Sequence, residues 1–475
     1  MNLLDENYVM ELIGEIESSQ NREFREEEIK ACEIYSGMLK EHVEDRIKQL
    51  YPKTWSSFSI ANVNLCKRII SKLSMSYKQN PIRELAGDAE SEDYSQLMKD
   101  ADASQAWQQF DIYYNLHRYA AMWFSFVEDE NEEQRIVLRP LAPFQFSRVV
   151  NSVGDTKVFI VNFPSRELYL THDTDGMRSN IQDSQQDTGC KRFALWSKDQ
   201  HVVVKYFEAN DKTKTCRIEY EEIEGNPDNT NPLGMIPAAF AQQGDNAALP
   251  IQNPLSDQVV EFNQQYSVML TGVSLQTFGH LVLKHPEDQK MPDEIYNSLF
   301  TYSRLPQKEG EAPTELDYLN PSPNLSSGSE ILKDYCNHIV AEHLGDGSQG
   351  IAGSESFKSG LDRMIAQADV SNIIESNQQV YAQAENTLYQ IVKAFYEASN
   401  DMRFKSDSIT VKYHKAKPIQ SEKEILENID TKIRLGLIER YEAIMALDPN
   451  MSEASAKEKI KAVNQGKQDN MDSFF

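Results

Sequence analysis

A segment rich in glycine and serine interrupts the most strongly helical part of the chain. Residues 345–360 have the sequence GDGSQGIAGSESFKSG, in which nine of sixteen residues are Gly or Ser. The hydrophobic pattern predicts a helix over 329–344 and a second helix over 361–397. The second helix would contain about 37 residues and be roughly 55 Å long. A flexible segment between two such helices predicts a loop that moves while both of its ends stay fixed.

The same segment contains the glycine spacing of a dinucleotide-binding loop, Gly345-x-Gly347-x-x-Gly350. A true loop of this kind follows a strand and opens a helix, whereas here a predicted helix precedes the glycines. We therefore expect no cofactor at this position. The sequence also has no phosphate loop ending in Gly-Lys-Ser/Thr, no HExxH and no GxSxG motif. These patterns give no indication of an enzyme.

Charge and cysteine content restrict the possible partners and the compartment. The 475-residue chain has a formal charge of −26, which disfavours simple DNA binding through a basic patch. This charge fits a solvated acidic surface or a surface that must not adhere to a nearby polyanion. The start of the chain is too acidic for a signal peptide, and no apolar stretch is long enough to span a membrane. Scattered cysteines predict free thiols in a reducing compartment: Cys32, Cys66, Cys190, Cys216 and Cys336.

The chain changes from helical to β-rich near Arg118. Residues 1–115 are predicted to be almost wholly helical, with helices over 22–51, 61–77 and 94–116. From there to about Phe240, short apolar runs separated by turn residues predict antiparallel meanders. The predicted strands are 122–127, 135–138, 145–150, 156–162, 168–171, 192–196, 201–208 and 215–223. Residues 173–188 are polar and predict a loop.

Helical patterns return after the turn 231–237. A stripe of apolar residues predicts a helix here. The stripe either packs against neighbouring helices or is one face of an ordinary core helix, and it consists of Val259, Phe262, Tyr266, Met269 and Val273. A proline-rich insert over 285–327 predicts a short helix at 293–298 and one or two strands. A further stripe predicts the core side of the helix before the glycine-rich segment: Ile331, Leu332, Tyr335, Ile339 and Val340. We also predict a strand at 408–414, helices over 418–447 and 452–464, and a polar tail.

Two groups of side chains could suggest metal binding or catalysis. Cys336 and His343 share a helical face, but His338 points nearly opposite, so packing is favoured over a zinc site. The acidic runs at 88–93 and 128–133 have no apolar surroundings that would perturb a carboxylate. They are predicted to be solvated loops.

The order of these segments resembles that of the portal proteins of tailed bacteriophages, a head-tail connector family, especially those of siphophages. Asn231-Pro-Leu-Gly-Met-Ile-Pro237 is similar to the family's turn before the stem, and Ser359-Gly360-Leu361 to its tunnel-loop segment. Arg434-Leu-Gly-Leu-Ile-Glu-Arg-Tyr441, followed by the acidic segment 448–457, resembles its C-terminal pattern, with Glu439 where Ser is frequent. The resemblance covers about residues 25–465.

The resemblance implies an α+β portal fold that assembles into a ring of about twelve subunits. Its parts would be a wing over 1–250 (helical over 1–117 and β-rich over 118–250), a stem helix over 251–283, a small α/β clip over 284–327, a second stem helix over 328–344, a tunnel loop over 345–360, a long helix and wing strand over 361–417, and a helical crown over 418–475. The tunnel loop would face DNA with Asp346, Ser348, Gln349, Ser354, Glu355 and Lys358.

The implied function is that of a channel at the capsid vertex for DNA packaging by terminase and for DNA ejection. The ring would be made in the host cytoplasm and reside in the virion, where it contacts double-stranded DNA, terminase, the head-tail adaptor, and the major capsid and scaffolding proteins. No membrane, metal or cofactor is implied. The alternative from the residues is another capsid-assembly protein, scaffold- or adaptor-like, with an enzyme as the least favoured class.

Overall fold

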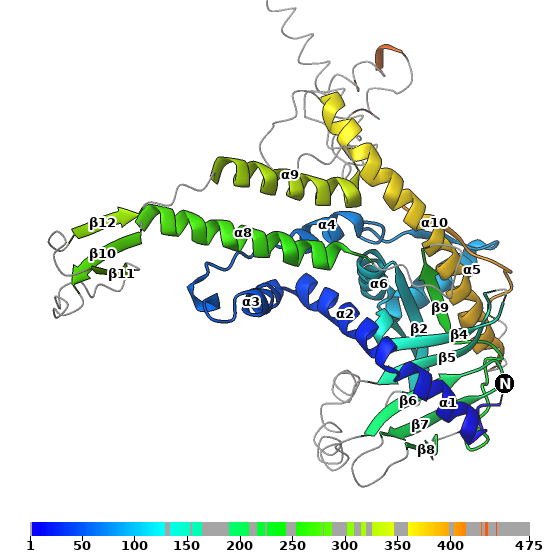
Figure 1. The fold of residues 1–475 in the computed structure, drawn as a ribbon. Helices are drawn as coiled ribbons and strands as arrows, with labels where there is room; N and C mark the ends of the chain where they lie inside the picture. Colours follow the sequence, from blue (N-terminus) through cyan, green and yellow to red (C-terminus); the bar gives the residue numbers. More distant parts are fainter. Residues whose placement is uncertain are drawn as a thin grey trace, which may run out of the picture. The chain divides into compact units, whose positions relative to one another are not determined.

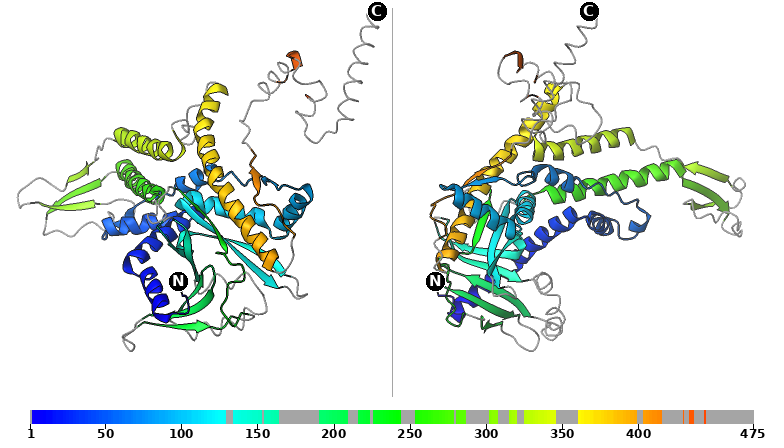
Figure 2. Two further views of the ribbon diagram at one scale, coloured as in Figure 1. Left: turned by 90° about the vertical axis from the view of Figure 1, so that its right-hand side faces the viewer. Right: turned by 180° about the vertical axis from the view of Figure 1, so that it is seen from behind.

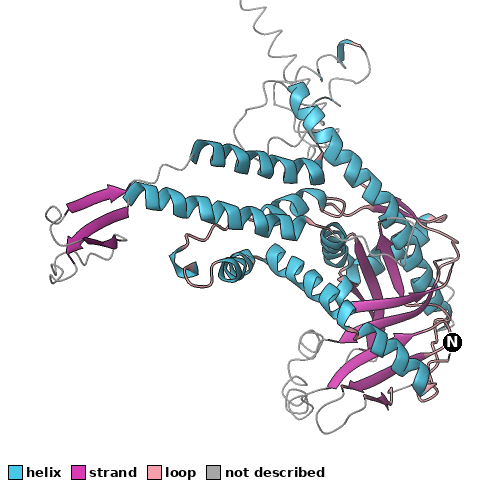
Figure 3. Ribbon diagram, viewed as in Figure 1, coloured by secondary structure: helices cyan, strands magenta, loops and turns pink. Residues whose placement is uncertain are grey.

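The chain has a mixed α+β architecture, as predicted (Figure 3). The computed structural model describes residues 2–128, 134–152, 154–163, 190–208, 216–223, 226–243, 253–278, 280–286, 302–307, 315–319, 325–345, 360–398 and 403–414, and a few positions between 429 and 443. The chain divides into two units. The first comprises Met1–Gly353 and Asp369–His414, and the second comprises Ser354–Ala368 and Lys415–Phe475. The predicted crown, strand 168–171 and loop 173–188 lie wholly or almost wholly outside the described residues.

The N-terminal part is helical but is cut into more helices than predicted. The helices are α1 (Glu6–Ile16), α2 (Ser19–Ser36), α3 (Leu39–Leu50), α4 (Leu65–Leu73), α5 (Asp88–Asp100) and α6 (Ala103–His117). The predicted helix 22–51 breaks at Gly37, whose φ of 126° is open to glycine. The predicted helix 94–116 breaks at Asp102, which has a φ of 48° in the left-handed region.

Two antiparallel sheets follow, and the larger is the predicted meander. In the smaller sheet, β2 (Tyr119–Glu128) lies between β3 (Gln134–Leu141) and β9 (Ala238–Gln242). The larger sheet has its strands in chain order: β4 (Phe146–Val150), β5 (Thr156–Phe163), β6 (Cys190–Trp196), β7 (His201–Phe207) and β8 (Arg217–Glu221). Val9 and Ile13 of α1 pack on this sheet. Strand β9 was not predicted as a separate strand.

The turn at 231–237 is organised by one buried asparagine. Asn231 is 7% exposed, and its Nδ2 donates to the carbonyls of Ser197 (2.7 Å) and Met235 (2.8 Å). Its Oδ1 accepts from the Leu233 N–H at 3.1 Å, and Gly234 has a φ of 62°. These bonds fix the turn that delivers the chain into β9.

Two long helices are connected in the chain by a small three-stranded sheet. Helix α8 (Leu255–Phe278) leads into β10 (His280–Pro286), and α9 (Leu325–Leu344) follows β11 (Tyr302–Gln307) and β12 (Glu315–Leu319). Strand β10 is central, parallel to β11 and antiparallel to β12. The predicted stem helix 251–283 is therefore wrong at its end, because the apolar run 281–283 pairs on both sides as a strand. The predicted short helix 293–298 lies outside the described residues.

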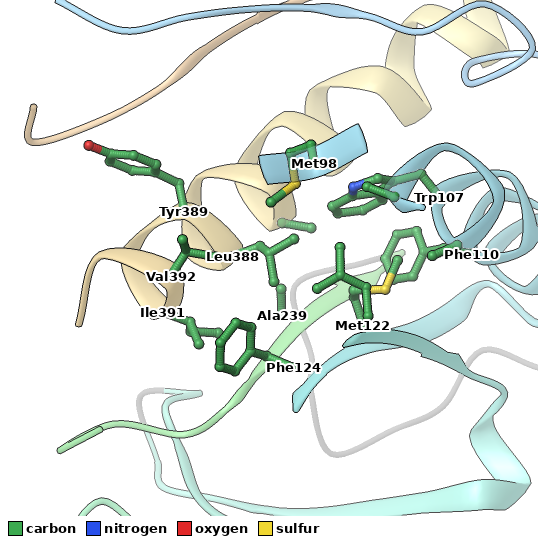
Figure 4. Close-up of a cluster of buried hydrophobic side chains, with 14 of the residues drawn as sticks. Met98, Trp107, Phe110, Met122, Phe124, Ala239, Leu388, Tyr389, Ile391 and Val392 are labelled. Carbon is green, nitrogen blue, oxygen red and sulfur yellow. The ribbon is translucent and has the colours of Figure 1, made fainter. Parts of the chain in front are cut away.

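The predicted long helix is confirmed as α10 (Gly360–Ala398), with 39 residues. Its C-terminal half lies at the centre of the largest hydrophobic cluster, where Leu388, Ile391 and Val392 meet α5, α6, β2 and β9 (Figure 4). The neighbouring side chains include Met98, Trp107, Phe110, Met122, Phe124 and Ala239. Beside it, β13 (Thr410–Lys412) pairs antiparallel with β1 (Ile82–Glu84), about 330 residues away in sequence.

Candidate functional site

The predicted tunnel loop can be followed only at its first and last residues. Residues 346–359, with all six of the side chains predicted to face DNA, lie outside the described residues. Gly345 directly follows α9, and Gly360 is the first residue of α10. A helix precedes the GxGxxG spacing, as the sequence indicated, so the context of a dinucleotide loop is missing.

Gly345 is required by the packing of the two helices. Its φ is 82°, and its N–H donates to the Ala341 carbonyl at 2.9 Å, which ends α9. A Cβ atom at this position would lie 2.5 Å from the Cβ of Asp369 on α10. The first glycine of the segment therefore allows α9 and α10 to approach each other closely.

Helices α8 and α9 run antiparallel and lie side by side in each view (Figures 1 and 2). Gln258 near the start of α8 bonds two residues near the end of α9, Glu342 at 2.8 Å and His343 at 3.0 Å. Farther along, the Tyr335 hydroxyl donates to Glu261 at 3.4 Å. These contacts hold α9 against α8 where the chain comes back from the β10–β12 sheet.

The predicted stripes account for only part of this packing. Val259, Phe262, Leu332, Ile339 and Val340 are buried, and Tyr266, Met269 and Tyr335 pack against the same cluster. Two predicted core residues are exposed, however: Val273 by 40% and Ile331 by 63%. Val273 lies one turn beyond Met269, the last residue of α8 that packs on this cluster, whereas Ile331 is next to the buried Leu332 but on another face of α9.

A row of polar side chains on α8 was not predicted and holds an extended segment. Asn263, Ser267 and Thr271 are spaced by four residues and therefore share one helical face. They accept from the backbone N–H groups of Val63 (2.7 Å), Ala61 (2.8 Å) and Ser59 (3.0 Å), respectively. The i, i+4 spacing of small polar residues was the available sequence signal.

A buried polar cluster joins α6 to α10 at the centre of the first unit. The carboxylate of Asp111 accepts from the Tyr381 hydroxyl (2.7 Å), Asn115 Nδ2 (2.7 Å) and the Ser76 N–H (3.0 Å). Asn377 Nδ2 donates to Asn115 Oδ1 at 2.9 Å. Burial raises the pKa of Asp111 to about 7, although these hydrogen bonds favour its charged form.

The raised pKa of Asp111 predicts stability that falls as the pH rises. Between about pH 4 and 7 the folded state keeps a proton that the unfolded state has lost, so folding is favoured at the lower pH. Asp111→Asn is neutral throughout. Its free energy of unfolding, relative to the wild type, should increase by about 2–3 kcal/mol between pH 5 and 8. Urea unfolding measures this, with the exposed Asp93→Asn as control; a parallel pH dependence of Asp111→Asn and wild type would contradict it.

Helix α10 is also joined to β1 by a buried ion pair. The Arg83 guanidinium donates to both Glu385 oxygens, at 2.5 and 2.8 Å. The two side chains are 9% and 0% exposed. Nearby, the ring of Tyr77 stacks on that of Trp107, with 5.1 Å between the ring centroids. The Tyr77 hydroxyl lies 3.1 Å from the hydroxyl of Tyr413. The Arg83–Glu385 pair therefore fixes α10 against β1.

The histidine considered for metal binding is buried and hydrogen-bonded within the fold. His343 is 5% exposed and bonded to Gln258, and burial lowers its pKa to about 4. In the described part of the chain, no group of three His, Cys, Asp or Glu side chains is placed to hold a metal ion.

The acidic run at 88–93 differs from its predicted form. The run at 88–93 is the first part of α5, not a loop, because acidic residues stabilise a helix N-terminus. Glu90 within it accepts from the Ser406 hydroxyl at 2.6 Å. Residues 129–133 of the other run lie outside the described residues.

Among the helices described, none is long and apolar enough to cross a membrane. Comparison of the sequence with protein-family models and with curated protein sequences finds no match.

Proposed function

We propose that this chain is the subunit of a portal ring at one vertex of a bacteriophage capsid. The ring, of about twelve copies, forms the channel through which terminase packages DNA and through which DNA is ejected. It also carries the docking surface for the head-tail adaptor and contacts the major capsid and scaffolding proteins in the virion.

The order of the elements is the observation that carries the proposal. Helices and two antiparallel sheets come first, followed by α8, the β10–β12 sheet, the returning α9, the break at Gly345 and the 39-residue α10. The resemblance assigns the same order to wing, stem, clip, stem, tunnel loop and long helix. In this assignment α8 and α9 are the stem, and the β10–β12 sheet belongs to the clip that docks adaptor and terminase.

Two further features are consistent with this assignment. Val273 of α8, beyond the residues that pack on the cluster with α2, α3 and α4, is 40% exposed, and Ile331 of α9 is 63% exposed. In the proposed ring, a neighbouring subunit would cover these apolar side chains. Helix α10, in contrast, is anchored by Asp111, Glu385 and the largest core. These contacts hold the part of α10 from Asn377 onward within the first unit.

The proposal predicts a closed ring of several hundred kilodaltons with a central hole. Negative-stain microscopy and mass photometry of the purified full-length protein at micromolar concentration test this directly. A species that remains monomeric or dimeric under these conditions would contradict the portal assignment. Extended or irregular assemblies without a central hole would instead favour the scaffold-like alternative.

A further inference from the structure

One long stretch of this acidic chain contains no acidic residue. Residues 46–83 include eight Lys or Arg and no Asp or Glu, although the whole chain has a formal charge of −26. Some of these cations have partners within the chain. Lys48 pairs with Asp45 at 3.1 Å, and Arg83 pairs with Glu385 in the core. The cations of α4 are different.

Helix α4 presents a wholly polar, basic face to solvent. Its other face is buried against the cluster shared with α2, α3, α8 and α9 through Leu65, Cys66, Ile69, Ile70 and Leu73. The exposed face consists of Lys67, Arg68, Ser71 and Lys72. The charged groups of these three cations have no hydrogen bond or ion pair with any residue in the described part of the chain. Their charge is therefore available to an external anion.

Helix α4, which carries this basic face, lies next to the end of α9 (Figure 1). Cys66 and Ile69 of α4 share a cluster with Val340 and Leu344, in the last two turns of α9. Gly345, the first residue of the predicted tunnel loop, follows directly. The predicted loop itself contains only one cation, Lys358. The exposed cations of α4 therefore belong to a helix that packs against the segment leading into the loop.

We propose that Lys67, Arg68 and Lys72 form a binding site for the phosphate backbone of double-stranded DNA. The inference rests on the proposed function, in which DNA passes the loop that begins at Gly345. Along the helix axis, Lys67 and Lys72 are about 7.5 Å apart. Successive phosphates of one DNA strand are about 3.4 Å apart along the duplex axis, so the three side chains can reach two or three of them.

The composition of the face favours a polyanion over a protein partner. Centres of protein–protein interfaces are poor in Lys and contain aromatic or other apolar side chains, whereas this face has none. Protein–DNA interfaces are strongly basic, and Lys, Arg and Ser are the usual phosphate donors. The net charge of −26 does not prevent such contacts, because exposed charges more than about 8 Å away are largely screened at physiological salt.

Salt-dependent binding of assembled rings to a fluorescent 30-base-pair duplex tests the site. In the triple variant Lys67→Gln, Arg68→Gln, Lys72→Gln, the slope of log affinity against log salt should fall by about 0.9 for each phosphate that is no longer neutralised. The matched control removes three exposed cations elsewhere, with Lys40→Gln, Lys99→Gln and Lys198→Gln, and should keep the wild-type slope. The charge-conserving variant Lys67→Arg, Lys72→Arg should also bind as the wild type does.

Several outcomes would overturn the site. Equal slopes for the α4 variant and wild type would show that these cations do not contact phosphate. Loss of rings in the α4 variant, with rings retained in the control, would show that the face joins two copies of the chain. If wild-type protein forms rings that bind DNA and the α4 variant binds with the same slope, only this inference is rejected. Wild-type protein that forms no rings rejects the proposed function itself.

Discussion

Replacing Arg83 with alanine should lower the free energy of unfolding by about 3–5 kcal/mol. The substitution leaves the carboxylate of Glu385 in the core, where it is 0% exposed and no longer has its bidentate partner. An uncompensated buried charge is far more costly than the loss of a surface ion pair. The chain would have to protonate Glu385 or admit water next to α10.

The β1–β13 ladder offers a matched control for this prediction. Lys412 pairs with Glu84 between the same two strands, but these side chains are 58% and 46% exposed. Lys412→Ala should therefore cost less than about 1 kcal/mol. The double variant Arg83→Met, Glu385→Met removes both buried charges and should recover most of the lost stability. Urea unfolding at one fixed protein concentration measures all three, and equal losses for Arg83→Ala and Lys412→Ala would count against the argument.

Local patterns predicted the elements whose stability is decided within a short window. The alternating strands β4 to β8 appeared as a meander because each pairs with its neighbour in the chain, and α10 appeared because its apolar spacing persists over many turns. The breaks at Gly37 and Asp102 were missed. Each is a single residue with positive φ inside an otherwise helical pattern.

Elements that depend on distant partners could not be predicted in the same way. Strand β13 was predicted within 408–414, but its three-residue partner β1 was not, and the pairing of the two could not be seen in either segment alone. The first residues of β10, up to Leu283, were assigned to a helix because the pairing with β11 and β12 decides the conformation of this strand. Ile331 has the right spacing for the core, yet α9 has no neighbour over it within the described chain.

The candidate site likewise has local features that the sequence predicted and distant contacts that it did not. The sequence located the glycine-rich break and the two helices that flank it. It did not reveal that Gly345 serves contact with Asp369, because that contact joins residues 24 positions apart on two helices. The basic face of α4 was hidden by the chain's net charge, which says nothing about local distribution.

Gly345→Ala should lower the free energy of unfolding by about 2–5 kcal/mol. Two separate costs contribute. A residue with a side chain at φ 82° costs about 1–2 kcal/mol, and crowding in a packed region costs about 1–3 kcal/mol more. The added Cβ would lie 2.5 Å from the Cβ of Asp369, and no rotamer change can move that atom. The end of α9 would have to separate from α10.

Two other glycines isolate these costs in the same urea-unfolding measurement. Gly234 has a φ of 62° with no atom within 4 Å of an added Cβ, so Gly234→Ala should show the conformational cost alone. Gly328 in α9 has neither constraint, and Gly328→Ala should be neutral or stabilising by up to about 1 kcal/mol. A loss for Gly345→Ala equal to that for Gly234→Ala would show that α10 yields without cost. In that case the contact with Asp369 does not fix the start of the predicted loop, because the two helices can part there freely.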